Sequence, residues 1–198
     1  SLESTLACRW IGKATHEVCE GEMQQIHHRG NLDLDEASYF QIIAGKTAAL
    51  TAVSSRLGAH YAGADAAAVD AMEAYGHHVG MAFQIADDVL DIWGEERATG
   101  KSLGTDLEKQ KLTLPLIRLL EIGEPAVVEL VRRLLTEARA ESRRALRPLL
   151  EESGALDYAW AKARWHVDQA VATLDLLRPS EFKDVLAEMA GYVVRRTA

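Results

Sequence analysis

Three aspartates lie within one short apolar stretch, FQIADDVLDIW, at residues 83–93. Asp87 and Asp91 are four residues apart, so on a helix they share a face with about 5–6 Å between their Cβ atoms. Asp88 lies about 100° further round the helix and can lean toward the same spot. Two ionised carboxylates about 4 Å apart repel by about 4 kcal/mol at an effective dielectric near 20. A divalent cation would remove this repulsion.

Magnesium is the cation that these ligands favour. Neither Lys nor Arg occupies the positions four residues away, which hold Phe83, Gln84, Ile92 and Glu95. Hard oxygen ligands without a neighbouring His or Cys suit Mg²⁺, which keeps several waters and recruits substrate phosphate. We therefore predict Asp87, Asp88 and Asp91 as metal ligands. The alternative is a solvated acidic face, because most charge clusters are simply wet.

Two other segments carry groups that could hold a phosphate. Lys46 and Thr47 lie in the apolar stretch IIAGKTAAL, where a lysine is out of place unless it faces an acid. The alternative is that Lys46 snorkels to the surface. The loop ERATGKSLGTDLEKQKLTLP carries Lys101 and Lys111 among glycines and hydroxyls, which suits a lid over phosphates. It is not a P-loop, because Gly94 and Gly100 are one residue too far apart and an acidic helix precedes them.

Other apparent motifs are excluded by their spacing. NLDLDE resembles the start of an EF-hand, but Glu36 stands where glycine is needed and Ile42 where glutamate is needed. HEVCE has Glu20 in place of the second histidine of a zinc-protease motif. Cys8 and Cys19 fit no zinc or redox spacing, so reduced thiols are expected.

Composition favours one domain. The 198 residues are 48% hydrophobic and 26% charged, which suits a compact domain with a real core. The formal net charge of −8 argues against nucleic-acid binding, which needs a clustered basic surface. No apolar run approaches the roughly 18 residues of a membrane span, and no signal peptide opens the sequence, so a cytoplasmic protein without a transmembrane segment is expected.

The elements that must position these residues are helices. Nearly every segment shows the helical period and none shows sustained strand alternation, which predicts a single all-α bundle over residues 1–198. Helices are expected at 2–28 and 36–61, then from the turn at 62–65 to about Trp93, with an irregular loop over 94–111. Further helices are expected at 112–122, 125–137, 140–153, 155–178 and 181–196. Pro148 should kink or split its helix.

The motifs resemble those of the all-trans polyprenyl (isoprenyl) diphosphate synthases. FQIADDVLD is similar to that family's second aspartate-rich motif, DDxxD preceded by FQ, and GKSLGTDLEKQKLTLP resembles the lysine-bearing stretch that follows it. AGKTAAL matches the family's Lys-Thr pair, and CEGEMQQ matches its GExxQ segment. Four motifs occur in the family's order over about a hundred residues, which makes the resemblance specific.

The resemblance implies a fold and a reaction. The fold is the isoprenoid synthase type, a bundle of long helices around a central cavity, normally in a homodimer. In the reaction, an allylic diphosphate ionises with the help of Mg²⁺, isopentenyl diphosphate attacks the carbocation, and a proton is lost. Metals and lysines then stabilise the charge on the departing diphosphate, while an apolar cavity keeps water from the cation.

The resemblance also implies roles for individual residues. Asp87 and Asp91 would serve one Mg²⁺, directly or through water, with Asp88 in support. The residues that would contact the allylic diphosphate are Lys46, Thr47, Gln84 and Lys101, and Asp87, Asp88, Lys46 and Lys101 would carry the catalysis. Lys111 is a further candidate, although the family usually has glycine where this chain has Gln110. Asp106 would close the loop back onto the site.

One motif of the family is missing. Nothing here matches its first aspartate-rich motif, and the sequence opens on Ser1. Either the family's N-terminal portion lies outside this sequence, which we favour, or the chain is a short subunit that needs a partner. Two alternatives to the synthase follow: a non-catalytic regulatory subunit of a heteromeric synthase, and a class I terpene cyclase. A cyclase need not carry the Lys-Thr pair, the FQ pair and the loop lysines.

Overall fold

The computed structural model describes residues 5–93, 104–137 and 140–195. All of the regular structure in these ranges is helical, which confirms the predicted all-α class. The elements are α1 (Thr5–His27), α2 (Glu36–Ile43), a π-helix η1 (Ala44–Ala48), α3 (Ala49–Tyr61), α4 (Ala66–Trp93), α6 (Thr105–Glu108), α7 (Leu114–Ile122), α8 (Pro125–Glu137), α9 (Ala140–Glu152), α10 (Ala155–Thr173), a 3₁₀ turn η2 (Leu174–Leu176) and α11 (Glu181–Arg195). No described helix is long and apolar enough to cross a membrane.

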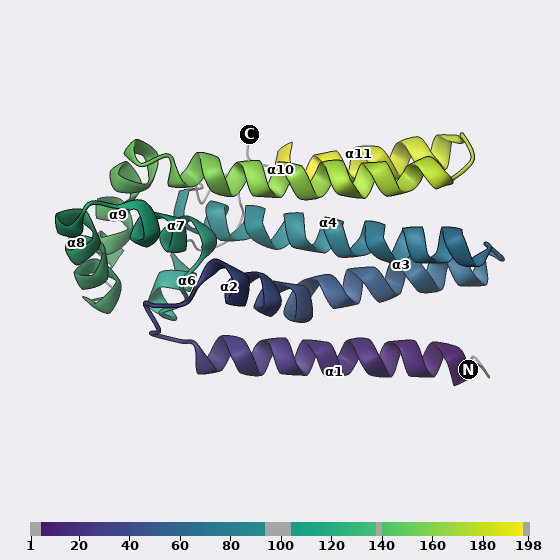
Figure 1. Cartoon of the computed structure of the whole chain (residues 1–198), viewed down its shortest axis with the longest axis horizontal. Coiled ribbons are helices and arrows are strands. Elements are labelled where there is room, and N and C mark those ends of the chain that lie inside the picture. The colour runs from purple at the N-terminus through teal and green to yellow at the C-terminus, as the bar shows by residue number, and fades with distance from the viewer. Residues whose placement is uncertain (1–4, 94–103, 138–139, 196–198) are drawn as a thin grey trace.

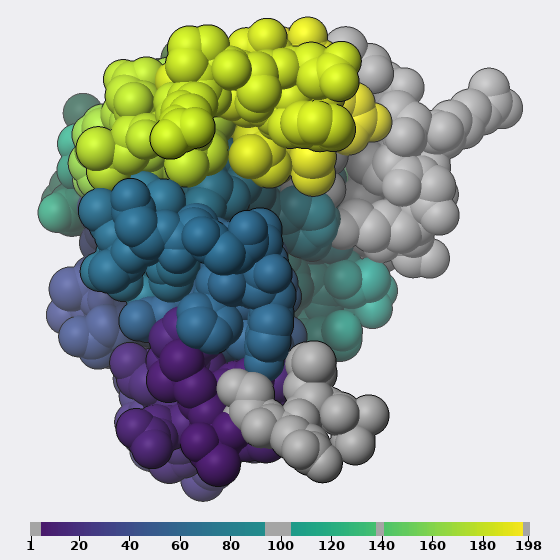
Figure 2. Space-filling view, turned by 90° about the vertical axis from the view of Figure 1, so that its right-hand side faces the viewer, coloured from purple at the N-terminus to yellow at the C-terminus, as the bar shows by residue number. Residues whose placement is uncertain are grey.

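The long helices lie side by side in layers (Figure 1). α1 forms one edge, α2, α3 and α4 form the middle, and α10 and α11 cover the opposite side of α4, an order that the end-on view also shows (Figure 2). The short helices α6 to α9 gather at one end of the bundle (Figure 1). Because α1, α3 and α4 alternate in direction, the last turns of α1, the start of α3 and the last turns of α4 all lie toward that end.

The second predicted helix contains a π-helical turn at the residues predicted to bind phosphate. The expected helix over 36–61 is present, but its middle residues, Ala44–Ala48, wind as a π-helix. A π-turn inserts extra backbone into the helix and re-aims the side chains within it, and such turns are frequent at functional sites. Lys46 and Thr47 lie in this turn. The sequence period alone did not predict it.

Gly21 allows the backbone of α1 to pack directly against the backbone of the π-turn. A Cβ added to Gly21 of α1 would lie 2.5 Å from the backbone nitrogen of Lys46. Real Cβ atoms do not come that close, so a larger residue would push the two elements apart. Gly80 plays the same part between α4 and α3, since its Cβ would lie 2.3 Å from Oγ1 of Thr51. The backbones that carry the predicted site are thus held close together by missing side chains.

Other boundaries differ modestly from the predicted ones. The loop expected over 94–111 contains the short helix α6, and α10 ends at Thr173 before a 3₁₀ turn where a helix to residue 178 was expected. Pro148 lies inside the continuous helix α9. A break at this proline was one of two expectations, and it is wrong for the assigned helix. Ser180 accepts a hydrogen bond from the backbone N–H of Lys183 and so caps the start of α11.

Two apolar clusters hold the described helices together. The larger joins α2, α4, α7, α8, α9 and α10, and its fully buried members include Tyr39, Ile85 and Leu116. The smaller joins α4, α10 and α11 around Tyr75, Leu174 and Ala190. α4 and α10 both contribute to the two clusters, so the contact between these helices links them.

Candidate active site

The site centres on the carboxylate of Asp88, which is completely buried. Its Oδ2 accepts a hydrogen bond from the hydroxyl of Tyr39 at 2.9 Å. Its Oδ1 accepts from Nε2 of Gln84 at 2.7 Å and from Nζ of Lys111 at 2.7 Å. Both oxygens are therefore engaged by groups of this chain. A buried charge needs such partners, because taking an unpaired carboxylate out of water costs several kcal/mol.

Lys111 ties the acidic helix to α6 and the segment that follows it. Its Nζ also reaches Oδ2 of Asp106 at 3.2 Å. The backbone of Gln110, the preceding residue, has a φ of 52°, the left-handed conformation that glycine adopts most easily. The resemblance implies a glycine at this position, and the glutamine here adopts a backbone conformation that glycine favours. Lys111 still reaches the predicted site.

The charge of Asp88 is offset within the chain by Lys111. No lysine or arginine lies four residues away on the same helix, and Lys111 comes from 23 positions along the chain. Asp91 is also satisfied within the chain, since it accepts from the hydroxyl of Thr105 at 3.1 Å and from the backbone N–H of Asp106 at 3.0 Å. Asp106 therefore joins α6, within the loop expected over 94–111, to the end of α4, as expected.

Asp87 stands apart from the other two acids. Asp88 and Asp91 are buried, while Asp87 is only half-buried. Of the three aspartates, it is thus the one that a ligand can approach from solvent. The structure separates three residues that the sequence grouped together: two are buried, and one is half-buried.

Lys46 faces an acidic group, as its unusual place in an apolar stretch suggested. Its Nζ lies 2.8 Å from Oε2 of Glu22 and 3.1 Å from Oε1 of Gln25, both on α1. The neighbouring Thr47 donates its hydroxyl hydrogen to Oε1 of Gln84 at 2.8 Å. A chain of hydrogen bonds therefore runs from Thr47 through Gln84 to Asp88.

Most of the predicted site residues are brought together. Hydrogen bonds link Thr47, Gln84, Asp88 and Lys111 directly, and Asp91 joins them through Asp106. Lys46 lies beside Thr47 and is held by α1. Lys101 lies outside the described residues.

Sequence reasoning missed Tyr39. It is 1% exposed and would pass for an ordinary core aromatic on α2. A signal was present, because a buried tyrosine hydroxyl normally finds a polar partner. The sequence could not say that the partner would be Asp88, which is 49 positions away.

Burial sets the electrostatics of this network. It raises the pKa of Asp88, and Lys111 acts in the opposite direction by favouring the charged carboxylate. Burial alone would lower the pKa of Lys111, but Asp88 and Asp106 together raise it above its ordinary value. Burial and the nearby charge of Asp88 also raise the pKa of Tyr39 well above its ordinary value. Tyr39 therefore stays protonated and acts as a hydrogen-bond donor.

The donor set fits a magnesium site only in part. Among the described residues, no group of three or more His, Cys, Asp or Glu side chains is arranged to hold a metal ion. The carboxylate chemistry suits Mg²⁺, and half-buried Asp87 is the residue placed to offer it. Because Mg²⁺ binds through one or two carboxylates together with waters and substrate phosphates, a complete protein cage is not required.

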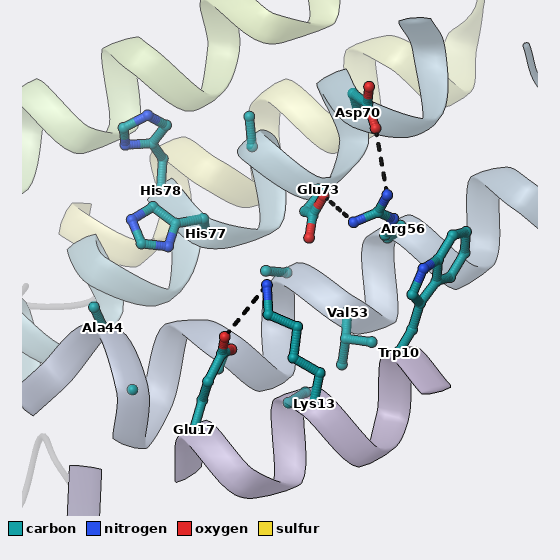
Figure 3. Close-up of a pocket in the computed structure, with 15 residues that line it drawn as sticks. Trp10, Lys13, Glu17, Ala44, Val53, Arg56, Asp70, Glu73, His77 and His78 are labelled. Carbon is teal, nitrogen blue, oxygen red and sulfur yellow. Dashed lines mark hydrogen bonds and ion pairs between the residues drawn. The ribbon is translucent and has the colours of Figure 1, made fainter. Parts of the chain in front are cut away.

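A separate cavity of about 560 Å³ lies between α1, α3 and the first half of α4. Figure 3 shows Arg56 of α3 reaching Glu73 and Asp70 of α4, while Lys13 pairs with Glu17 on α1. None of the predicted site residues lines this cavity. A wall with this many charges would be costly to cover with hydrocarbon. We therefore do not assign it to a substrate.

Comparison with known proteins gives a consistent result. The polyprenyl synthetase family model matches residues 2–152. An octaprenyl diphosphate synthase of Haemophilus influenzae is 34% identical over 196 residues, covering 98% of this chain and 60% of the relative. A heptaprenyl diphosphate synthase component 2 of Geobacillus stearothermophilus is 33% identical over 186 residues, covering 94% of this chain and 58% of the relative.

A solved structure agrees in shape as well as sequence. The polyprenyl synthase of Caulobacter crescentus CB15, complexed with calcium and isoprenyl diphosphate, matches with a TM-score of 0.93 at 35% identity, covering 98% of this chain and 60% of that one. The chain thus spans about 60% of the length of the relatives it matches. The family model covers most of the chain, and the bundle and the order of the motifs agree with it. This chain belongs to the polyprenyl synthetase family.

Proposed function

We propose that the protein is a prenyltransferase that joins an allylic diphosphate to isopentenyl diphosphate and releases a linear trans-polyprenyl diphosphate. The observation that carries the proposal is the cluster of Asp88, Gln84, Thr47 and Lys111, linked by hydrogen bonds beside Asp87 and Lys46. Family membership supports the same reaction class. Because the chain spans about 60% of the length of its relatives, the activity of the whole enzyme is a proposal for this chain.

Mg²⁺ is the proposed cofactor, and its site would use Asp87 most directly. When bound, the metal would stabilise negative charge on the departing diphosphate. The match to a structure that holds calcium and isoprenyl diphosphate supports a divalent cation in this role. Asp88 and Asp91, whose oxygens already accept hydrogen bonds from the chain, would position the helix that presents Asp87.

The chain's own residues would bind and orient the diphosphate. Lys46 would turn away from Glu22 and Gln25 toward the phosphates. Its ammonium group would be attracted more strongly by a diphosphate, which carries several negative charges, than by the single, partly exposed carboxylate of Glu22. Lys101 is proposed as a second cation at the site. The hydroxyl hydrogen of Thr47 is already donated to Gln84, so Thr47 would meet a ligand with its lone pairs unless Gln84 reorients.

The proposal is tested with the full protein, isopentenyl diphosphate, an allylic primer and Mg²⁺. Asp87→Ala should lower turnover by at least about a hundredfold while the melting temperature changes little, because a half-buried side chain contributes little to the core. Asp168→Ala, which removes an exposed aspartate of α10, is the matched control and should keep wild-type turnover. A collapse of the melting temperature with activity per folded molecule preserved would contradict the assignment.

The second candidate is a regulatory subunit that binds diphosphate without turning it over. The relative named as a component 2 supports a heteromeric assembly for this second candidate. For the synthase itself we propose a homodimer. Absence of product at every Mg²⁺ concentration, with diphosphate binding retained, would favour this candidate. Co-purification with an identical or a different chain would separate the two assemblies. A class I terpene cyclase is a less favoured function than either of these two candidates. We also propose that the protein is cytoplasmic.

A further inference from the structure

Tyr39 is the component of the site that neither the motifs nor the proposed chemistry uses. It lies on α2, five residues before the start of the π-turn that carries Lys46, and its side chain is 1% exposed. Its hydroxyl spans the gap between α2 and α4 to reach Asp88 Oδ2 at 2.9 Å. A side chain so deeply buried, with its one polar atom on a carboxylate of the site, is placed to control that carboxylate.

The two carboxylate oxygens of Asp88 accept different numbers of hydrogen bonds. Gln84 and Lys111 both donate to Oδ1, whereas Tyr39 donates to Oδ2. The hydroxyl of Tyr39 therefore fixes the rotation of the carboxylate about its own axis. Without the Tyr39 hydroxyl, Oδ2 of Asp88 would be buried and would lose this hydrogen-bond donor. The carboxylate would then rotate so that both of its oxygens share the donors Gln84 and Lys111.

That rotation would be transmitted to the rest of the site. Lys111 bridges Asp88 and Asp106, and the backbone of Asp106 donates to Asp91. On the other side, Gln84 connects Asp88 to Thr47. The carboxylate of Asp88 is thus bonded on one side to Gln84 of α4, the helix that carries Asp87, and on the other side to Lys111, which contacts α6 through Asp106.

We infer that Tyr39 is a positioning residue for the magnesium–diphosphate site, acting through Asp88 on the presentation of Asp87. The inference rests on the function proposed above. Tyr39 touches no substrate in this role, so it is not a catalytic residue. It acts as groups behind a metal's direct ligands do in other proteins, where their loss commonly weakens metal affinity by about 10–100-fold.

The test is calorimetric titration of the full chain with inorganic pyrophosphate in the presence of Mg²⁺. Tyr39→Phe keeps the ring and removes only the hydroxyl, and it should weaken binding by about tenfold. Tyr75→Phe is the matched control on α4. It removes another tyrosine hydroxyl, which donates to the backbone carbonyl of Leu186 at 2.8 Å in the second apolar cluster. Tyr75→Phe should bind within twofold of wild type, although both variants lose a comparable amount of thermal stability.

A second pair of variants separates positioning from a general loss of packing. If Tyr39 acts through Asp88, then Tyr39→Phe should change binding by less than twofold in an Asp88→Asn background, where the charge it orients is gone. An equal effect of Tyr39→Phe in both backgrounds would overturn the inference. So would wild-type binding by the single variant, equal weakening by Tyr75→Phe, or a Tyr39→Phe protein that does not fold.

The outcomes also distinguish this inference from the proposed function. If wild-type protein fails to bind pyrophosphate with Mg²⁺, the proposed function fails and the role inferred for Tyr39 falls with it. If wild type binds and Tyr39→Phe binds equally well, only the inference about Tyr39 fails.

Discussion

A buried carboxylate illustrates how single residues behave in this protein. Asp88 has no exposure to solvent, yet a phenol, an amide and an ammonium group surround it. Such an arrangement adds little net stability, because desolvation offsets most of the attraction between the charges. Its value lies in specificity, since only one arrangement of α2, α4 and the segment after α6 satisfies all of these groups.

A second polar contact, which is partly buried, joins two histidines of α4 and α10. Nδ1 of His78 lies 2.9 Å from Nδ1 of His166, so at least one of the two nitrogens must lack a hydrogen. Burial, followed by the nearby His78, His77 and Lys162, lowers the pKa of His166 to about 4. The pair is therefore neutral at pH 7.

This pair predicts a loss of stability in acid. In the unfolded chain His166 takes up a proton near pH 6.5, whereas in the folded protein it resists protonation until about pH 4. The unfolded state thus binds more protons between these values, and stability falls as the pH is lowered through this window. The contribution is about 1–2 kcal/mol at pH 5.

Urea unfolding at pH 7 and pH 5 checks this prediction. His166→Gln should reduce the difference in unfolding free energy between the two pH values by about 1–2 kcal/mol. His16→Gln, at an exposed position on α1, should keep the wild-type difference. If His166→Gln shows the full wild-type difference, the pair is not the source of the acid sensitivity.

At the scale of elements, the close contact of α1 with the π-turn is the feature most sensitive to one added methyl group. The Cβ in Gly21→Ala would meet backbone atoms of Gly45 and Lys46, and these cannot swing aside as a flexible side chain would. Overpacking of this kind costs about 1–3 kcal/mol. We expect Gly21→Ala to lower the unfolding free energy by that amount and to weaken the contacts of Lys46 with α1.

The same helix provides the control. Gly12 also lies in α1, but nothing stands within 4 Å of the Cβ that alanine would add. Gly12→Ala should stabilise the protein by about 0.5–1 kcal/mol, because alanine favours the helix. Paired chemical denaturation curves of the two variants would show opposite signs. A stabilising Gly21→Ala would refute the close contact between α1 and η1.

The turn after α6 permits a second prediction at this scale. Gln110 holds a left-handed backbone conformation, which costs a residue with a Cβ about 1–2 kcal/mol. Gln110→Gly removes that strain and loses part of the gain to the greater freedom of glycine when unfolded. The net expectation is a gain of up to about 1 kcal/mol in unfolding free energy.

Gln41→Gly is the contrasting variant. Gln41 is an exposed residue within α2, and glycine there should cost about 1 kcal/mol. Thermal melting would rank Gln110→Gly above wild type and Gln41→Gly below it. A loss of stability in both variants would show that the side chain of Gln110 contributes more than its backbone strain costs.

For the whole molecule, the arrangement of the helices matters more than any one of them. The site lies where the last turns of α1, the π-turn before α3, the last turns of α4 and the helix α6 meet, so it exists only when these elements are packed (Figure 1). A ligand that binds there binds the folded chain and not the unfolded one. It should therefore stabilise the whole fold by mass action.

Mg²⁺ with pyrophosphate should raise the melting temperature of the chain. At a ligand concentration of 100 times the dissociation constant the stabilisation is about 2.7 kcal/mol, which corresponds to several degrees for a chain of this size. A chelator should reverse the shift, and Asp87→Ala should abolish most of it. An equal shift with pyrophosphate alone would show that the metal does not take part in binding.

The sequence determined the helical class, most of the helix boundaries and the identity of the acids and lysines. These follow from local rules: a period of 3.6 residues, turn-forming glycines and prolines, and carboxylates spaced to share a face. The place of Lys46 in an apolar stretch suggested that it faces an acid, with snorkelling to the surface as the alternative, and Glu22 lies beside it. In each case the evidence comes from residues close together in the chain.

Only the tertiary structure decided how the three aspartates differ. Asp88 and Asp91 are satisfied by Tyr39, Lys111, Thr105 and Asp106, and Asp87 is the acid left half-buried at the site. Three of these contacts span 49, 23 and 14 positions along the chain. Helical periodicity places residues on faces of one helix, but it does not say which distant side chain packs against each face. That choice belongs to the packing of the whole bundle, and it separates an acid that holds the fold from one that can meet a ligand.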